Sequence, residues 1–91
     1  MSRDWDEVGY VISSTYRVKV LRRLADSPAP PSKIAADTDS ATSHVSRALS
    51  DLREQGLVDL LVPESRQKGR IYGITDYGRE VWETIDAQNL A

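Results

Sequence analysis

The sequence contains no cysteine and no phenylalanine, and its single histidine is His44. Without cysteine the chain has no disulfide, no thiolate ligand for zinc and no thiol nucleophile. It has no apolar run near the roughly 18 residues that span a membrane. Its start, Met-Ser-Arg-Asp-Trp-Asp-Glu, lacks the basic and then apolar pattern of a signal peptide. These absences predict a cytoplasmic protein with no membrane partner.

The length limits what the chain can enclose. At 91 residues it can form one hydrophobic core, and we expect a single domain over residues 1–91. Too little chain remains for a sizeable catalytic cleft, so we expect no enzyme, no cofactor and no metal site. Ser40, His44 and Asp51 lie close in sequence, but on one helix they lack the orienting group that a catalytic triad needs.

The formal net charge of −2 is distributed unevenly. Residues 8–75 contain ten basic residues (Lys or Arg) and seven acidic residues (Asp or Glu). Residues 1–7 contain one basic and three acidic residues, and residues 76–91 contain one basic and four acidic residues. The middle of the chain is therefore basic and both ends are acidic, which permits a nucleic-acid partner in the middle. Nine Arg against three Lys, and nine Asp against five Glu, are also typical of salt-loving archaea, although an acidic bacterial protein fits as well.

A helix-turn-helix is predicted between Ser32 and Leu57. Its second helix has an apolar stripe at spacings of three and four residues, made up of Ala41, Val45, Ala48, Leu49 and Leu52. The opposite side has short polar and basic side chains, namely Thr42, Ser43, His44, Ser46, Arg47 and Ser50. Serine and threonine are poor helix formers, because their hydroxyls compete for backbone hydrogen bonds, so helix stability does not explain this side.

We interpret the polar side as a recognition surface for double-stranded DNA. Short side chains let a helix approach the major groove closely, and Arg47 is suited to a bidentate contact with guanine or a contact with phosphate. An ordinary serine-rich exposed face is the alternative. Gly56 follows this helix at the position where a left-handed residue is expected.

The helix before the helix-turn-helix is predicted over residues 15–25, after an N-cap at Ser13 or Ser14. Its basic residues form either a solvated face or a surface near the DNA backbone. These residues are Arg17, Lys19, Arg22 and Arg23, and for the last two we favour the solvated face.

A short helix follows, starting at Pro31 or Ser32 and burying Ile34 and Ala35. It carries Lys33, which we include among the predicted DNA contacts. Residues 37–40 are the predicted turn, in which Asp39 or Ser40 supplies the N-cap of the recognition helix.

A β-hairpin is predicted after the recognition helix. Residues 58–62 and 70–75 alternate as strands, with Tyr72 and Ile74 facing inward, and residues 63–69 form a polar tip. Arg66, Lys68 and Arg70 are suited to phosphates or the minor groove beside the recognition helix. An edge hairpin whose charges prevent aggregation is the alternative.

The two terminal segments are predicted to be helices with apolar sides. Asp4 caps the first, which ends near Ile12, and Thr75 caps the second, which runs from Asp76 to about Asn89. One small core leaves surplus apolar side chains, so we expect a subunit interface at both ends. Its predicted residues are Trp5, Val8, Val11, Ile12, Val81, Trp82 and Ile85. The alternative is that these helices only close the core of one chain.

Three motifs carry a family resemblance over roughly residues 14–85. They are Tyr-Arg-Val-Lys-Val-Leu-Arg-Arg-Leu, His-Val-Ser-Arg-Ala-Leu-Ser-Asp-Leu-Arg-Glu-Gln-Gly-Leu-Val and Gly-Arg-Ile-Tyr-Gly-Ile-Thr-Asp-Tyr-Gly-Arg-Glu-Val. With them the sequence resembles a winged helix-turn-helix transcriptional regulator, ArsR/MarR-like and of archaeal type. The expected fold class is mainly α with a small β-hairpin.

The resemblance implies a homodimer that binds DNA. We expect an N-terminal helix over residues 1–13, a DNA-binding core with its wing over residues 14–75, and a C-terminal dimerisation helix over residues 76–91. Without a cysteine pair, or a histidine beside the acidic residues of the last helix, metal sensing is not expected, and the sequence does not identify a small-molecule effector. A winged-helix module that binds another protein in a transcription complex is the alternative function.

Overall fold

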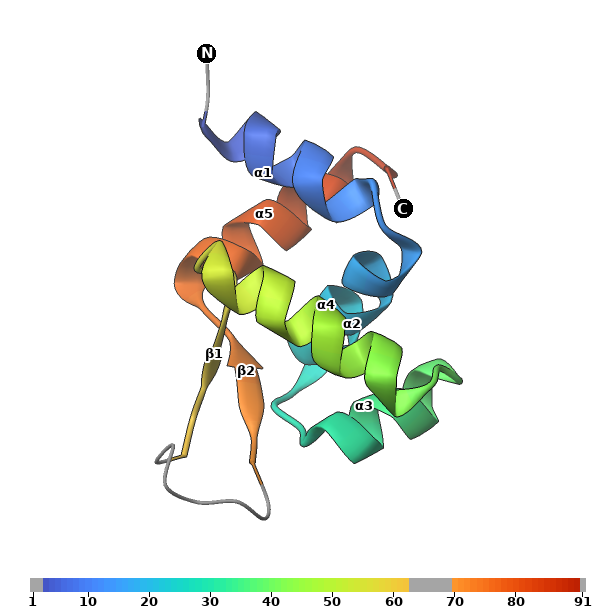
Figure 1. The fold of residues 1–91 in the computed structure, drawn as a ribbon. Helices are drawn as coiled ribbons and strands as arrows, with labels where there is room; N and C mark the ends of the chain where they lie inside the picture. Colours follow the sequence, from blue (N-terminus) through green and yellow to red (C-terminus); the bar gives the residue numbers. More distant parts are fainter. Residues whose placement is uncertain (1–2, 63–69, 91) are drawn as a thin grey trace.

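The computed structural model describes residues 3–62 and 70–90, apart from the side chains of residues 3 and 4. In this part the chain is mainly helical with one antiparallel hairpin (Figure 1). In order, the elements are α1 (Arg3–Ile12), α2 (Thr15–Asp26), α3 (Pro31–Thr38), α4 (Thr42–Glu54), β1 (Val58–Leu60), β2 (Tyr72–Ile74) and α5 (Asp76–Ala87). None of these helices is both long and apolar enough to cross a membrane.

Figure 1 shows α1 lying across α5 at one end of the molecule, with the hairpin and α3 toward the other end. Helix α2 is central and packs against α1, α3, α4, α5 and β2. It begins after Ser14, whose side chain accepts a hydrogen bond from the Arg17 N–H, which confirms the predicted N-cap. Helix α1 already begins at Arg3, so Asp4 lies within its first turn and the predicted cap at Asp4 is wrong.

The turn of the helix-turn-helix differs from its predicted form. Helix α3 begins at Pro31, as expected, but it continues through Thr38, and Asp39 then adopts a left-handed conformation with φ of 52°. The Ser40 N–H donates to the Ala35 carbonyl at 3.0 Å, so Asp39 and Ser40 close α3 and neither caps α4. The N-cap of α4 is Ala41, which makes no side-chain cap and is exposed rather than part of the buried stripe.

The C-terminus of α4 confirms the role predicted for Gly56. This residue has φ of 79°, and the Leu57 N–H donates to the Leu52 carbonyl at 2.9 Å. The paired bond from the Gly56 N–H to the Arg53 carbonyl completes a Schellman motif. The chain is thereby turned from α4 into β1.

The hairpin strands are three residues each, shorter than predicted. Val58 pairs with Ile74 and Leu60 with Tyr72, and both β2 side chains are half-buried against the core. Tyr72 also forms a β-bridge with Ala29, which ties the segment after α2 to the hairpin. The predicted tip, with Arg66 and Lys68, lies outside the described residues.

The core extends into both terminal helices. The side chains of Val8, Val11, Val81 and Ile85 are at most 2% exposed within one chain, because α1 and α5 pack against each other and against α2. These four residues therefore cannot form an exposed subunit interface, and that part of the prediction is wrong. Trp5 is 50% exposed, Ile12 is 39% exposed and Trp82 is half-buried against the core.

The start of α5 is hydrogen-bonded to the segment between α4 and β1. Thr75 caps α5, as predicted, by accepting a hydrogen bond from the Gly78 N–H at 2.9 Å. Its own N–H donates to the Leu57 carbonyl at 3.0 Å. Gly78 is buried against the same carbonyl, so the absence of a side chain there permits the close approach.

We predict opposite effects for two Gly→Ala substitutions in helices. A Cβ at position 78 would collide with the Leu57 carbonyl oxygen and lie 2.9 Å from an Ile74 side-chain carbon. Gly78→Ala should therefore destabilise the fold by about 3 kcal/mol, the upper end of common overpacking costs. Gly9→Ala is the matched control: a Cβ there meets nothing within 4 Å, so it should stabilise α1 by about 0.5–1 kcal/mol. Urea unfolding measures both, and equal effects of the same sign would contradict the packing described.

Candidate nucleic-acid interface

Helix α4 presents one polar face to solvent. The described side chains on this face are all exposed, as the periodicity predicted: Thr42, Ser43, His44, Ser46, Arg47 and Ser50. On the other side Val45, Ala48, Leu49 and Leu52 are buried against the rest of the domain. The face has no acidic residue from Thr42 to Ser50, and its hydroxyls and its guanidinium are groups that can donate hydrogen bonds. The first acidic residue of the helix is Asp51, which contacts Arg17.

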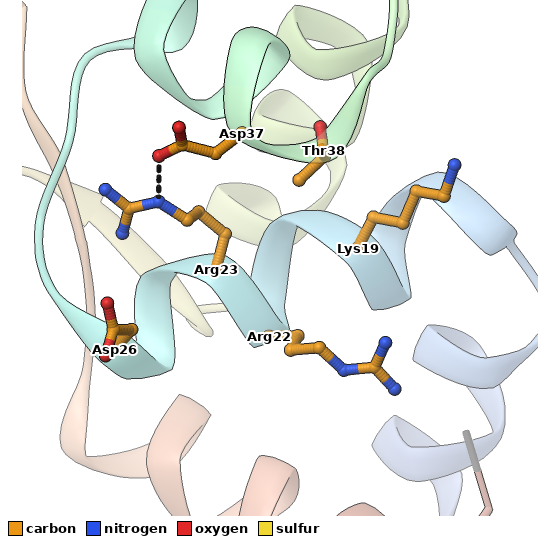
Figure 2. A pocket seen from close by; sticks show the side chains of 6 residues that line it. All are labelled: Lys19, Arg22, Arg23, Asp26, Asp37 and Thr38. Atoms are coloured by element: carbon orange, nitrogen blue, oxygen red, sulfur yellow. Dashed lines mark hydrogen bonds and ion pairs between the residues drawn. The ribbon is translucent and has the colours of Figure 1, made fainter.

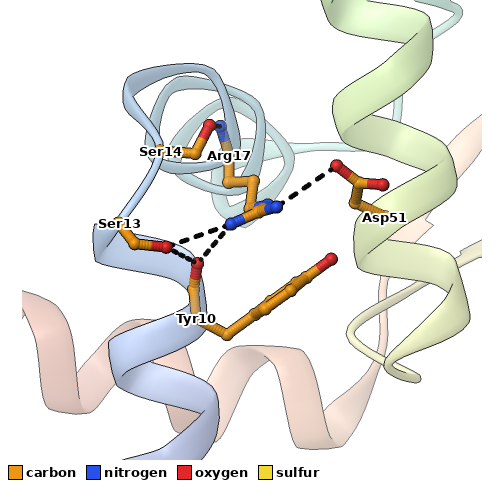
Figure 3. Close-up of polar contacts among 5 residues, drawn as sticks. All are labelled: Tyr10, Ser13, Ser14, Arg17 and Asp51. Carbon is orange, nitrogen blue, oxygen red and sulfur yellow. Dashed lines mark hydrogen bonds and ion pairs between the residues drawn. The ribbon is translucent and has the colours of Figure 1, made fainter.

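Arg17 links three helices behind this face (Figure 3). Its guanidinium donates to the Tyr10 carbonyl, in the last turn of α1, at 2.8 Å and to the hydroxyl of Ser13, the residue after α1, at 3.1 Å. It also lies 3.5 Å from the Asp51 carboxylate on α4 and 3.9 Å from the centre of the Tyr10 ring. With its side chain 20% exposed, Arg17 is a connecting residue rather than part of a solvated face or a DNA-facing surface.

The environment of Tyr10 is consistent with this packing. Burial raises the pKa of its phenol above the ordinary value, and the positive charge of Arg17 partly opposes that shift. The hydroxyl therefore stays protonated near neutral pH. Tyr10 contributes a neutral ring for the guanidinium to stack on.

Arg23 makes a second link, from α2 to the end of α3 (Figure 2). Its Nε lies 2.8 Å from the Asp37 carboxylate, and its Nη1 donates to the Ser27 carbonyl at 2.9 Å. The side chain is 12% exposed, so the predicted solvated face is wrong for Arg23. Arg22 is exposed, with its guanidinium 5.4 Å from the Trp82 ring centre.

A groove of about 400 Å³ runs between α2 and α3 beside this pair. Figure 2 shows its lining residues, which are Lys19, Arg22, Arg23, Asp26, Asp37 and Thr38. The Lys33 ammonium lies 3.7 Å from the Asp37 carboxylate, yet its side chain is 60% exposed. Lys33 therefore remains accessible as a candidate phosphate contact, although Asp37 offsets part of its charge.

One partner of the polar face was not predicted. Tyr16, at the start of α2, stacks on His44 with ring centroids 4.3 Å apart and an interplanar angle of 6°. The two residues are distant in sequence, so only the packing of α2 on α4 brings them together. In the sequence, this contact is indicated only by the position of a tyrosine in the first turn of a predicted helix.

The residues considered for a catalytic triad have separate partners. The Ser40 hydroxyl donates to the Thr38 carbonyl, Asp51 contacts Arg17, and His44 stacks on Tyr16. No group of three or more His, Cys, Asp or Glu suited to a metal ion occurs among residues 3–62 and 70–90. Arg70 is exposed where the chain enters β2.

Comparison with known proteins gives one family match. A family model described as the HVO_A0261 N-terminal domain matches residues 5–89. A search of curated protein sequences gave no match.

Solved structures share the fold at low sequence identity. A mutant of ZitR from Lactococcus lactis is 19% identical with a TM-score of 0.75, and the match covers 85% of this chain and 53% of ZitR. The MarR family regulator NMB1585 from Neisseria meningitidis is 22% identical with a TM-score of 0.71, and the match covers 85% of this chain and 56% of NMB1585. MepR from S. aureus, solved in complex with DNA, is 17% identical with a TM-score of 0.72, and the match covers 93% of this chain and 72% of MepR.

These matches show a winged-helix fold of the kind found in MarR-family transcription regulators. The chain spans about half the length of ZitR and NMB1585. The predicted fold class is thereby confirmed.

We predict that Arg23 sets the titration of Asp37. The hydrogen bond from Arg23 lowers the pKa of this carboxyl below its ordinary value of 3.8, and the charge of Lys33 adds a smaller effect. Because the pKa is lowered on folding, the pair stabilises the fold above the unfolded pKa, and this contribution is lost as the pH falls through the folded pKa. In a carboxyl ¹³C titration, Arg23→Gln should raise the Asp37 midpoint more than the control Lys33→Gln. An equal rise of the Asp37 midpoint in both variants would show that positive charge alone, and not the hydrogen bond from Arg23, lowers the pKa of Asp37.

Proposed function

The chain belongs to the HVO_A0261 N-terminal domain family, and from this premise we propose that it is a sequence-specific DNA-binding transcription regulator. The observation that carries the proposal is the exposed polar face of α4 on a winged-helix fold. In helix-turn-helix proteins the second helix enters the major groove, and its N-terminal residues contact base edges. Here Thr42, Ser43, His44, Ser46, Arg47 and Ser50 would fill that role.

The distribution of charge supports this orientation. The acidic terminal segments form α1 and α5, at the end of the molecule away from α3 and the start of α4 (Figure 1). DNA docked on α4 would therefore lie near the basic middle of the chain and away from the acidic ends, where phosphates would be repelled. MepR, which shares the fold, was solved with DNA.

Contacts outside α4 would position the protein without reading sequence. Lys33 on α3 and Arg70 beside β2 are exposed cations on either side of the recognition helix in the chain. With Arg66 and Lys68 they would bind phosphates or the minor groove. Phosphate contacts supply affinity for all sequences, whereas base contacts supply preference.

Arg47→Ala should lower affinity for the preferred DNA site and relax discrimination at one base pair, by about 1–3 kcal/mol if the contact is bidentate to guanine. The matched control is Arg53→Ala, which removes the same charge from the C-terminal turn of the same helix, where Arg53 pairs with Asp59. Titrating preferred and scrambled duplexes at fixed salt separates preference from general affinity. Unchanged binding by Arg47→Ala would remove α4 as the recognition helix.

We further propose a twofold homodimer built on the exposed side of α1. Trp5 and Ile12 are seven residues apart, so they lie on one side of the helix, and both are large apolar groups in contact with solvent. Trp82 on the adjoining α5 is partly accessible as well. A second copy would cover these groups and place two recognition helices about one turn of DNA apart, roughly 34 Å, on a near-palindromic site.

The double substitution Trp5→Glu with Ile12→Glu should give monomers that bind the palindromic site much more weakly, because charged groups would be buried in the interface. Light scattering at micromolar concentration should give twice the chain mass for the wild type and the chain mass for the variant. Leu61→Glu is the control, since Leu61 is 55% exposed but lies after β1. A monomeric wild type would refute the dimer, and loss of dimers in the control would show that the effect is not specific to α1.

A further inference from the structure

We propose that Tyr16 is a positioning residue for base recognition, which it serves by fixing the imidazole of His44. The inference deepens the proposed function and rests on it. Tyr16 stands on α2, outside the helix-turn-helix, so the recognition surface would depend on a residue that does not need to contact a base itself.

The first observation is the geometry of the pair. The Tyr16 and His44 rings are nearly parallel, 6° apart, with centroids separated by 4.3 Å. Tyr16 is 36% exposed and His44 is exposed, so the pair lies at the surface rather than in the core. Tyr16 therefore covers one face of the imidazole while the pair as a whole remains open to solvent.

The second observation is that both rings arise from anchored backbone. Tyr16 is in the first turn of α2, two residues after the Ser14 cap, and Val20 and Leu21 further along that helix are buried. His44 is in the first turn of α4, next to Val45, which is 0% exposed. Both helices are anchored in the core, so the stack restrains the histidine ring relative to the whole domain.

The chemistry of imidazole gives this restraint a consequence. Imidazole makes its hydrogen bonds in the plane of the ring, through Nδ1 and Nε2. A ring held against Tyr16 has a defined plane, so its nitrogen edge can meet a base edge without selecting one rotamer from several. The N-terminal residues of a recognition helix are the ones that contact bases, and His44 is the third residue of α4.

A purely structural stack would behave differently in a binding experiment. It would alter stability, or affinity for every sequence, but it would not alter preference at a single base pair. A direct contact from the Tyr16 hydroxyl to phosphate would be lost in Tyr16→Phe, whereas a stack would be retained. These differences define the test.

The test selects binding sites from a randomised duplex DNA library with the full chain. Tyr16→Ala should lose about threefold to tenfold discrimination at one base position, the range expected for one aromatic pair. His44→Ala should lose preference at the same position, and Tyr16→Ala combined with His44→Ala should lose no more than His44→Ala alone. Tyr16→Phe should match the wild type. Thr15→Ala is the control, since Thr15 is an exposed neighbour on α2.

A second measurement tests the stack without DNA. The chain has a single histidine, so its imidazole proton resonances are assigned directly. The tyrosine ring current should shift them upfield in the wild type and in Tyr16→Phe, and Tyr16→Ala should remove the shift.

Three results would overturn the role of Tyr16 while leaving DNA recognition intact. They are an unchanged base preference in Tyr16→Ala, a uniform loss at all positions, and a loss in Tyr16→Phe equal to that in Tyr16→Ala. A wild-type protein that selects no motif would instead overturn the proposed function, and the role of Tyr16 with it.

Discussion

The exposed face of α4 depends on the burial of its opposite face. Val45, Leu49 and Leu52 are at most 2% exposed, and transferring such side chains from water stabilises the fold by roughly 1.5–3 kcal/mol each. Once that stripe is buried, the helical repeat places Ser43, Arg47 and the other polar residues of this face on the solvent-exposed side of the helix. The candidate interface is therefore a consequence of core packing, and the buried residues of α4 determine its orientation.

Helix α2 adds polar restraints to this packing. Arg23 contacts Asp37 on α3, and Arg17 contacts Asp51 on α4, so each helix of the helix-turn-helix has one guanidinium–carboxylate pair with α2. Partly exposed pairs of this kind contribute little stability on their own. Their geometric effect is larger, because a planar guanidinium with several donors limits how neighbouring helices slide or rotate. Arg17 also contacts the end of α1 through the Tyr10 carbonyl, so α1 and α4 both contact the side chain of Arg17.

The apolar sides of the terminal helices are mainly buried in the core of one chain. A chain of 91 residues buries a limited area, and Val8 and Ile85 belong to the hydrophobic cluster that the described residues form. Counting apolar residues along the sequence overstated the surface available to a second copy. Among the described side chains of α1, the large apolar ones that remain exposed are Trp5 and Ile12, a smaller and more specific surface than the sequence suggested.

The sequence alone determined the helical periodicity, an N-cap at Ser13 or Ser14, the cap at Thr75, the left-handed Gly56 and the polar side of α4, since each depends on residues a few positions apart. It did not determine that Asp39 would close α3, because a polar residue at a turn suits either the end of one helix or the start of the next. The Tyr16–His44 stack, the links from Arg17 and Arg23, and the burial of Val8 and Ile85 were decided only by the tertiary structure. Each of these features joins segments that are far apart in the chain. The local sequence around such a side chain fits a solvated position and a packed position equally well, so its environment is known only when its neighbours in space are known.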